Sequence, residues 1–288
     1  MKALWLVSFR PFGKSRINDL FQSIFVDSVK SLDFDVTLSL TQFDDLNVKK
    51  FIDEKNIKNF YINIPKINLP PKKKYSNKLM LDNALKQYID EDDYQYLIYS
   101  NADIIVPNNL FDELTKIKQK DFCAFVYPNT HIINGNLKNT FWPHFGIDLI
   151  IFKISKDKAI NFKEIIKSYN AYGWGLQENF YMAASEALKL KSINLFKKLK
   201  VIKFENDFSA FSEDRIGQIN SWKENQKYFL NFLRVNNLNK LYAYGSYYYL
   251  LFKVLNFRDL NFSLILSYII FYPYNLIKKV ISKLKNND

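Results

Sequence analysis

Tyr96-Leu-Ile-Tyr-Ser-Asn-Ala-Asp103-Ile-Ile-Val-Pro107 is an apolar run interrupted by one short polar triplet, Asn101-Ala-Asp103. The apolar, β-branched and aromatic residues before the triplet predict a buried strand of a parallel sheet. The triplet would then lie where the strand ends, the edge at which open α/β sheets bind their ligands. Asn101 and Asp103 are two residues apart, so in a strand their side chains point the same way. Their oxygens are hard ligands that can hold a divalent cation, and the cation can hold a diphosphate.

Strands and helices alternate on both sides of this stretch. Apolar runs predict strands at 3–8, 59–64, 122–127 and 144–152, and an alternating pattern predicts one at 34–40. Apolar residues at helical spacing, or helix-capping residues, predict helices at 17–32, 48–54, 76–88, 108–119 and 177–190. This order is typical of an α/β fold with a mainly parallel sheet flanked by crossover helices. Asn108 is expected to cap its helix, and the Asn-rich segment 128–143 is expected to be a long loop.

The composition is that of a folded, basic protein. Of its 288 residues 48% are hydrophobic, which allows a sizeable core. A net charge of +12 favours anionic partners, namely nucleic acid, an acidic membrane surface or phosphorylated small molecules. The lysines are spread along the chain, which argues against nucleic acid. Two histidines exclude a site of three or more histidines, and the single cysteine, Cys123, is expected to be a buried inert thiol.

Further polar residues follow the predicted strands or occupy the predicted helices near the same edge. Gly173 and Gly175 flank Trp174 and are expected to expose its indole ring. Glu178 lies in the first turn of the helix predicted from 177, where the helix macrodipole favours an anion. The candidates are Ser8, Arg10, Asp44, Asp45, Lys78, Asn83, Asp148, Trp174 and Glu178.

Several blocks, in this order, resemble bacterial glycosyltransferases of the GT-A fold that use nucleotide sugars. The resemblance covers roughly residues 3–212. Asn101-Ala-Asp103 resembles the Asp-x-Asp motif, which in that family binds the metal and the donor's pyrophosphate and ribose. Gly173-Trp-Gly-x-Gln-Glu178 is similar to a Gly-Trp-Gly-x-Glu-Asp element. The acidic residue of that element contacts the acceptor or acts as the base of inverting enzymes.

The resemblance implies a glycosyltransferase that moves a sugar from a nucleotide-diphosphate donor to a glycan or lipid-linked acceptor. It implies a divalent cation, Mn²⁺ or Mg²⁺, at Asp103 and Asn101. Glu178 or Asp148 would act as the base if the reaction inverts configuration, whereas a retaining reaction needs none. The residues expected to bind the nucleotide sugar are Ser8, Arg10, Asp44, Lys78, Asn83, Asn101, Asp103 and Trp174.

Two departures from the family pattern concern the metal. The motif begins with Asn101, so Asp103 is its only carboxylate. Many of these enzymes also supply a histidine ligand after the last core strand, and the segment 204–208 contains none. Either Glu205 or Asp207 takes that role, or the metal is held weakly, or none is needed.

Each assignment has a simpler alternative. The triplet can be a turn that ends a strand, Glu178 can stabilise its helix N-terminus, and Asp148 can bond the amides of a loop. Trp174 can belong to the core, and the remaining polar residues can be solvated.

Two other classes of protein compete with a glycosyltransferase. A nucleotidyltransferase usually has a Gly-rich loop after the first strand, where this chain has only Gly13. A non-catalytic basic module on a membrane or nucleic acid has no need of polar residues at strand ends.

The last part of the chain is expected to differ from the rest. We expect a catalytic domain over 1–215 and a helical region over 216–288. Segment 260–277 is apolar, is interrupted by Pro273 and precedes several lysines. It falls short of the roughly 20 residues that cross a bilayer, and it fits a helix lying on an anionic membrane. The alternative is a helix hairpin packed on the domain or on a partner subunit, which leaves a homo-oligomer open.

The expected location follows from the two ends of the chain. The start, 1–7, is too short for a signal peptide, and the single cysteine is consistent with a reducing compartment. We therefore expect a cytoplasmic protein that is peripheral on the inner face of the cytoplasmic membrane. Its expected role is the synthesis of a bacterial surface glycan such as capsule, lipopolysaccharide or lipooligosaccharide.

Overall fold

The structure is a computed structural model of the chain. It describes residues 2–9, 16–41, 46–57, 60–63, 77–91, 93–126, 128, 130–133, 135–139, 147–167, 177–196, 198–205, 226–238 and 242.

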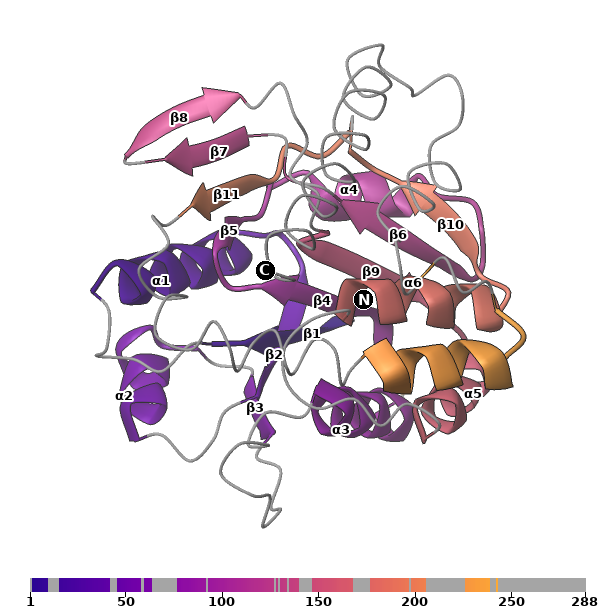
Figure 1. Cartoon of the computed structure of the whole chain (residues 1–288). Coiled ribbons are helices and arrows are strands. Elements are labelled where there is room, and N and C mark those ends of the chain that lie inside the picture. The colour runs from indigo at the N-terminus through magenta and orange to yellow at the C-terminus, as the bar shows by residue number, and fades with distance from the viewer. Residues whose placement is uncertain are drawn as a thin grey trace, which may run out of the picture.

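The central element is a sheet of seven strands in the order β10-β6-β9-β4-β1-β2-β3 (Figure 1). All neighbouring pairs are parallel except those of β9, which runs antiparallel to both β4 and β6. The strands are β1 Lys2–Ser8, β2 Asp35–Thr41, β3 Phe60–Asn63, β4 Tyr94–Asn101, β6 Phe122–Val126, β9 Leu149–Lys153 and β10 Lys191–Asn194.

Helices cover both faces of this sheet. One face packs on α1 Arg16–Lys30, α2 Leu46–Glu54 and α4 Leu110–Thr115, and the other on α3 Asn77–Asp90, α5 Lys156–Lys167, α6 Gln177–Ala187 and a helix at 226–235. Successive residues of β1 therefore enter different clusters, with Trp5 on the first face and Leu4 and Leu6 on the second. Because both faces are buried there, β1, β6 and β9 are nearly continuous apolar runs rather than alternating ones.

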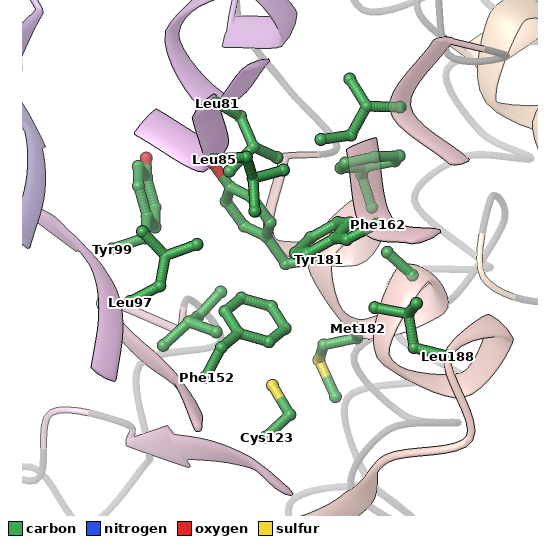
Figure 2. Close-up of a cluster of buried hydrophobic side chains, with 14 of the residues drawn as sticks. Leu81, Leu85, Leu97, Tyr99, Cys123, Phe152, Phe162, Tyr181, Met182 and Leu188 are labelled. Atoms are coloured by element: carbon green, nitrogen blue, oxygen red, sulfur yellow. The ribbon is translucent and has the colours of Figure 1, made fainter. Parts of the chain in front are cut away.

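Aromatic rings dominate the core under α3, α5 and α6. Tyr181 projects from α6 into a cluster that also contains Tyr99, Phe152 and Leu85 (Figure 2). Its ring centroid lies 4.8 Å from that of Tyr99 on β4, and Phe152 on β9 lies 5.2 Å from Phe162 of α5. Cys123 is fully buried in the same cluster, as its apolar surroundings predict.

A second sheet of four strands, β5-β11-β7-β8, lies beyond the end of β4 (Figure 1). Its strands are β5 Ile104–Ile105, β7 Thr130–Ile133, β8 Asn136–Asn139 and β11 Ile202–Glu205. The prediction of one long loop over 128–143 is therefore wrong, because β7 and β8 pair as an antiparallel hairpin. Gly135 takes a φ of +77° at its turn, a conformation that favours glycine.

The start of α4 also differs from the sequence-based prediction. The helix begins after Asn109, whose side chain makes no capping hydrogen bond. Asn108, the predicted cap, instead accepts a hydrogen bond from the Ser31 hydroxyl at 3.2 Å. Its side chain therefore ties the end of α1 to the β5–α4 connection.

The described part of the C-terminal region packs on α6. The ring centroid of Phe232, in the helix at 226–235, lies 5.1 Å from that of Phe180 on α6. Further along the chain, the hydroxyl of Tyr242 donates to the carboxylate of Glu186. The predicted boundary near residue 215 stays a prediction, and segment 260–277 lies outside the described residues. Across the residues that the structure describes, no helix has the length and apolar character needed to cross a membrane.

Candidate active site

Polar residues gather at one edge of the central sheet because of its strand directions. Ser8, the last residue of β1, is level with Thr41 at the end of β2 and with Asn101 at the end of β4. Asp148 reaches the same edge from the opposite direction, since β9 is antiparallel and begins with Leu149 opposite Ser100. The sheet thus brings Ser8, Asn101 and Asp148 together.

Asn101 and Asp148 are held to each other by two contacts. The backbone N–H of Asn101 donates to the carbonyl of Asp148 at 3.1 Å. The side-chain amide of Asn101 donates from Nδ2 to Oδ1 of the Asp148 carboxylate. Asp148 is only 1% exposed, whereas Asn101 is half-buried. The first residue of the triplet is therefore fixed by the residue that precedes β9.

Lys203 of β11 completes this cluster. Its Nζ donates to Oδ1 of Asp148 at 2.6 Å, and the two side chains are 12% and 1% exposed. A buried carboxylate needs such a partner, because an unpaired charge in the protein interior is strongly unfavourable. Lys203 is not among the candidates that the sequence suggests. The signal that it offered was one cation inside the apolar run Val201-Ile-Lys-Phe204.

Asp103 lies just beyond the end of β4. It is half-buried, and its backbone carbonyl accepts the N–H of Phe204 at 2.8 Å. The next two residues form β5, which pairs with β11. The triplet is therefore anchored at both ends, Asn101 by Asp148 and Asp103 by β11.

The N-terminus of α6 lies at the same edge. The helix ends just before β10, which is parallel to β6, so its first turn lies at the carboxyl end of the parallel strands. Its Tyr181 packs on Tyr99, two residues before Asn101. Glu178 is one helical turn before Tyr181, a rise of roughly 4.5 Å. The backbone of Glu178 therefore lies on the helix turn next to the end of β4.

The N-terminus of α3 is placed in the same way. α3 precedes the parallel strand β4 and packs on β1 and β4, so it begins at the carboxyl edge. Lys78 is in its first turn and Asn83, which is half-buried, lies in the second. At the other end of the helix, the Tyr88 hydroxyl donates to the Ile154 carbonyl at 2.9 Å, and burial raises the pKa of Tyr88 to about 12.

Three predicted site residues, Arg10, Asp44 and Trp174, lie outside the described residues, as does Asp45. Cys123 is described and lies away from this chemistry. Its thiol is fully buried, and burial raises its pKa well above the ordinary value of 9.0. The thiol stays protonated at neutral pH and is therefore no candidate for a nucleophile.

The residues at the edge offer few ligands to a metal. Within the described ranges no group of three or more His, Cys, Asp or Glu side chains could hold a metal ion. The Asp148 carboxylate is already engaged by Lys203 and Asn101. Asp103 and Asn101 are the residues of the triplet whose side-chain oxygens could hold a cation that also binds a ligand's phosphates. Oδ1 of Asp103 is buried.

Comparisons with known proteins support the fold. No protein-family model and no curated protein matches the chain. Among solved structures, the chain is similar to S. aureus TarS 1–349 in complex with UDP-GlcNAc, with a TM-score of 0.53 and 12% identity over 84% of this chain and 69% of that one. A putative nucleotide-diphospho-sugar transferase from Desulfovibrio desulfuricans G20 has a TM-score of 0.42 and 14% identity over 80% and 97% of the two chains.

A third similar structure belongs to another class of enzyme. It is the 4-diphosphocytidyl-2C-methyl-D-erythritol synthase from Anaerococcus prevotii DSM 20548, with a TM-score of 0.41 and 10% identity over 67% of this chain and 86% of that one. At 12% identity the likeness to TarS concerns the fold alone. The predicted fold class, a GT-A-like mixed α/β sheet, mainly parallel and flanked by helices, is confirmed.

Proposed function

We propose that the protein is a glycosyltransferase that uses a nucleotide-diphosphate sugar. The observation that carries the proposal is the meeting of Asn101, Asp103 and Asp148 at the carboxyl edge of the sheet, next to the first turn of α6 with Glu178. Open α/β sheets bind ligands at this edge. TarS, which shares the fold, is in complex with UDP-GlcNAc, and this makes uridine-diphosphate sugars the first donors to test.

The reaction replaces one bond at the anomeric carbon of the sugar by another. An acceptor hydroxyl attacks this carbon, the bond to the diphosphate breaks, and the nucleoside diphosphate leaves with the electron pair. In the inverting form of the reaction, Glu178 accepts the proton of the hydroxyl. Its position in the first turn of α6 places its backbone at the edge where the donor would bind.

The leaving group gathers negative charge, which the site must stabilise. Asp103 and Asn101 are the residues that would hold a divalent cation, and a cation there would neutralise charge on the diphosphate. Arg10 is proposed to contact the phosphates. Ser8, Asp44, Lys78 and Asn83 are proposed to contact the nucleoside, and Trp174 the sugar.

The acceptor and the place of action belong to the same proposal. The net charge of +12 and the apolar segment 260–277 with its following lysines support an anionic membrane surface and a lipid-linked or glycan acceptor. We therefore propose a role in bacterial surface-glycan synthesis. Flotation of the full chain with anionic vesicles, compared with a chain ending at Arg258, tests this part. Equal flotation of the two chains would refute the membrane anchor.

A thermal-shift screen tests the donor. The wild-type chain is mixed with UDP-, GDP- and dTDP-sugars, each with and without MnCl2. A ligand at 100 times its Kd stabilises a folded protein by about 2.7 kcal/mol, so we expect a clear rise in Tm for one nucleotide. Asp103→Ala should abolish this rise, while Asp112→Ala, an exposed carboxylate on α4, should keep it. If no nucleotide raises the Tm of the wild type, the proposal fails.

A further inference from the structure

The contact between Asn101 and Asp148 determines which way the Asn101 amide faces. An amide has an NH₂ donor at one end and a carbonyl acceptor at the other, and an ionised carboxylate can only accept. The end that meets the Asp148 carboxylate must therefore be Nδ2, as the structure shows. The carbonyl oxygen, Oδ1, is then the end of the Asn101 amide that does not meet the Asp148 carboxylate, and the residue is half-buried.

Lys203 makes this arrangement stable. Asp148 is 1% exposed and Lys203 reaches the same oxygen, Oδ1, that Asn101 contacts. One cation and one carboxylate give a neutral cluster, and the amide adds a donor without adding a charge. The three residues come from β4, from the residue before β9 and from β11, so the cluster also joins the second sheet to the first.

The cluster also explains why an asparagine begins the triplet. A second carboxylate at position 101 would lie in contact with the buried Asp148 carboxylate, and like charges in such a partly buried contact repel each other. Lys203 is the cation that the structure places on Asp148, and it can compensate only one of them. Asparagine keeps an oxygen for the ligand and turns the other end into a donor for Asp148.

We propose that Asp148 and Lys203 are positioning residues, which fix the Asn101 amide so that its carbonyl oxygen faces the nucleotide. This rests on the proposed function as far as the nucleotide is concerned. The likeness of the triplet to Asp-x-Asp alone would predict that a second carboxylate strengthens nucleotide binding, and this proposal predicts the opposite. Asn101→Asp restores two carboxylates to the triplet, yet it should weaken nucleotide binding rather than strengthen it.

The experiment is a charge exchange between positions 101 and 148. The variants are Asn101→Asp, Asp148→Asn and the double variant that carries both changes. The controls are the same changes at exposed positions, Asn161→Asp on α5 and Asp112→Asn on α4. The probe is whichever of UDP, GDP, ADP and CDP raises the Tm of the wild type most, and its Kd is measured by calorimetry with and without MnCl2.

We expect each single variant to raise the Kd of the probe at least tenfold. Asn101→Asp places two carboxylates in contact, and Asp148→Asn removes the acceptor that orients the amide. The double variant again has one carboxylate and one amide in contact, with a carboxylate oxygen of residue 101 facing the nucleotide. Its Kd should return to within about threefold of the wild type. A residue that only supported the fold would change the Tm without ligand and leave the Kd of the folded protein unchanged.

Lys203 is tested by a matched pair of variants. Lys203→Arg keeps a cation beside Asp148 and should keep the Kd within about threefold, whereas Lys203→Met should raise the Kd at least tenfold. Once a donor is identified, the loss should appear in KM for the donor more than in kcat, because a positioning residue of the donor site acts on binding. Unchanged binding in Lys203→Met would overturn the role of Lys203.

Two results would overturn the proposal as a whole. The first is nucleotide binding by Asn101→Asp that equals or exceeds that of the wild type. The second is a double variant no better than the single ones. If the wild type binds none of the nucleotides, the proposed function fails, and the cluster is then tested through Tm without ligand. The single variants should melt lower and the double variant should recover, and additive losses would refute the coupling.

Discussion

The apolar core around Phe152 is fully buried and the polar cluster at the carboxyl edge is partly buried, and the two are built on different principles. The core consists of rings from β4, β9, α5 and α6 that need no particular partner atom. The edge cluster of Asn101, Asp148 and Lys203 depends on three specific hydrogen-bonding atoms from separate elements. Apolar burial stabilises a fold broadly, while a buried ion pair contributes little net stability because its charges lose their water. The comparison indicates that the core stabilises the fold broadly, whereas the edge cluster fixes residues of β4 and β11 relative to Asp148.

The largest expected effect is a loss of catalytic rate at the carboxyl edge without a loss of stability. Glu178→Gln removes the proposed base, so we expect kcat to fall by about 10²–10⁴-fold, the range for general bases. The Tm and the rise in Tm caused by the nucleotide should stay as in the wild type. The measurement is initial rates of nucleoside-diphosphate release with acceptor present.

The matched control for Glu178→Gln is Glu164→Gln. Glu164 is an exposed carboxylate on α5 that pairs with Lys167 at 2.5 Å. This control should leave the rate unchanged. A Glu178→Gln enzyme with wild-type turnover would show that Glu178 is not the base.

The second largest expected effect is a loss of stability on truncating a side chain of the core. Phe152 is 1% exposed and packs against Phe162 at 5.2 Å and Tyr181 at 6.1 Å. Phe152→Ala leaves a cavity, and we expect the free energy of unfolding to fall by about 3–5 kcal/mol. Urea denaturation measures it. Phe152→Leu should cost less because it fills more of the space, and equal stability of the three proteins would contradict the assignment of this cluster as the core.

A smaller loss of stability is expected only at high pH, and it comes from the buried phenol of Tyr88. Burial raises the pKa of Tyr88 from 10.0 to about 12, so the folded state favours the protonated phenol. This contribution is fully present below pH 10 and is lost as the pH rises from 10 to 12. Two pKa units correspond to up to about 2.7 kcal/mol of the free energy of unfolding.

Tyr88→Phe removes the ionisable group and should flatten this part of the pH profile. It also removes the hydrogen bond to the Ile154 carbonyl, which should cost about 1–3 kcal/mol at neutral pH. Urea midpoints of the wild type and the variant at pH 8, 10 and 11 test both points. Parallel losses of stability in the two proteins would show that Tyr88 does not cause the alkaline slope.

The smallest expected effect concerns an ion pair on the surface. Lys50 and Glu54 of α2 lie 3.7 Å apart, and their side chains are 75% and 61% exposed. Lys50→Ala should change the free energy of unfolding by less than about 0.5 kcal/mol. In contrast, Lys203→Met leaves the buried Asp148 carboxylate without its cation, which is costly even though the intact pair adds little net stability, so the Tm should fall clearly. Similar effects of the two variants would remove the distinction between the edge cluster and an ordinary surface pair.

The sequence predicted the strands that are buried on both faces, because long apolar runs in β1, β4, β6 and β9 have few other interpretations. It did not predict the second sheet. The hairpin of β7 and β8 consists of strands of four residues with several Asn and Thr, which are too short and too polar to show a period. Its existence depends on pairing with β11, 69 residues after Ile133 in the chain, counted from Ile133 to Ile202.

The same limit applies to the site. Asp148 could be predicted as a candidate, because a carboxylate before an apolar strand is conspicuous in a sequence. Its partner could not be predicted, since Lys203 follows 55 residues later and meets it only through the pairing of β11 with β5. Side chains that meet through the strand order of a sheet leave no spacing in the sequence that would reveal them.

The packing of the helix at 226–235 on α6 has a practical consequence for shortening the chain. Glu186, which accepts the Tyr242 hydroxyl, and Phe180, which packs on Phe232, belong to the helix that begins at Gln177. A chain ending at residue 215 would lack Phe232 and Tyr242, which contact α6. We expect the position of the first turn of α6, with Glu178, to be less well fixed in such a chain. Expression trials that remove the tail should therefore stop beyond Tyr242, and Arg258 is a suitable cut point.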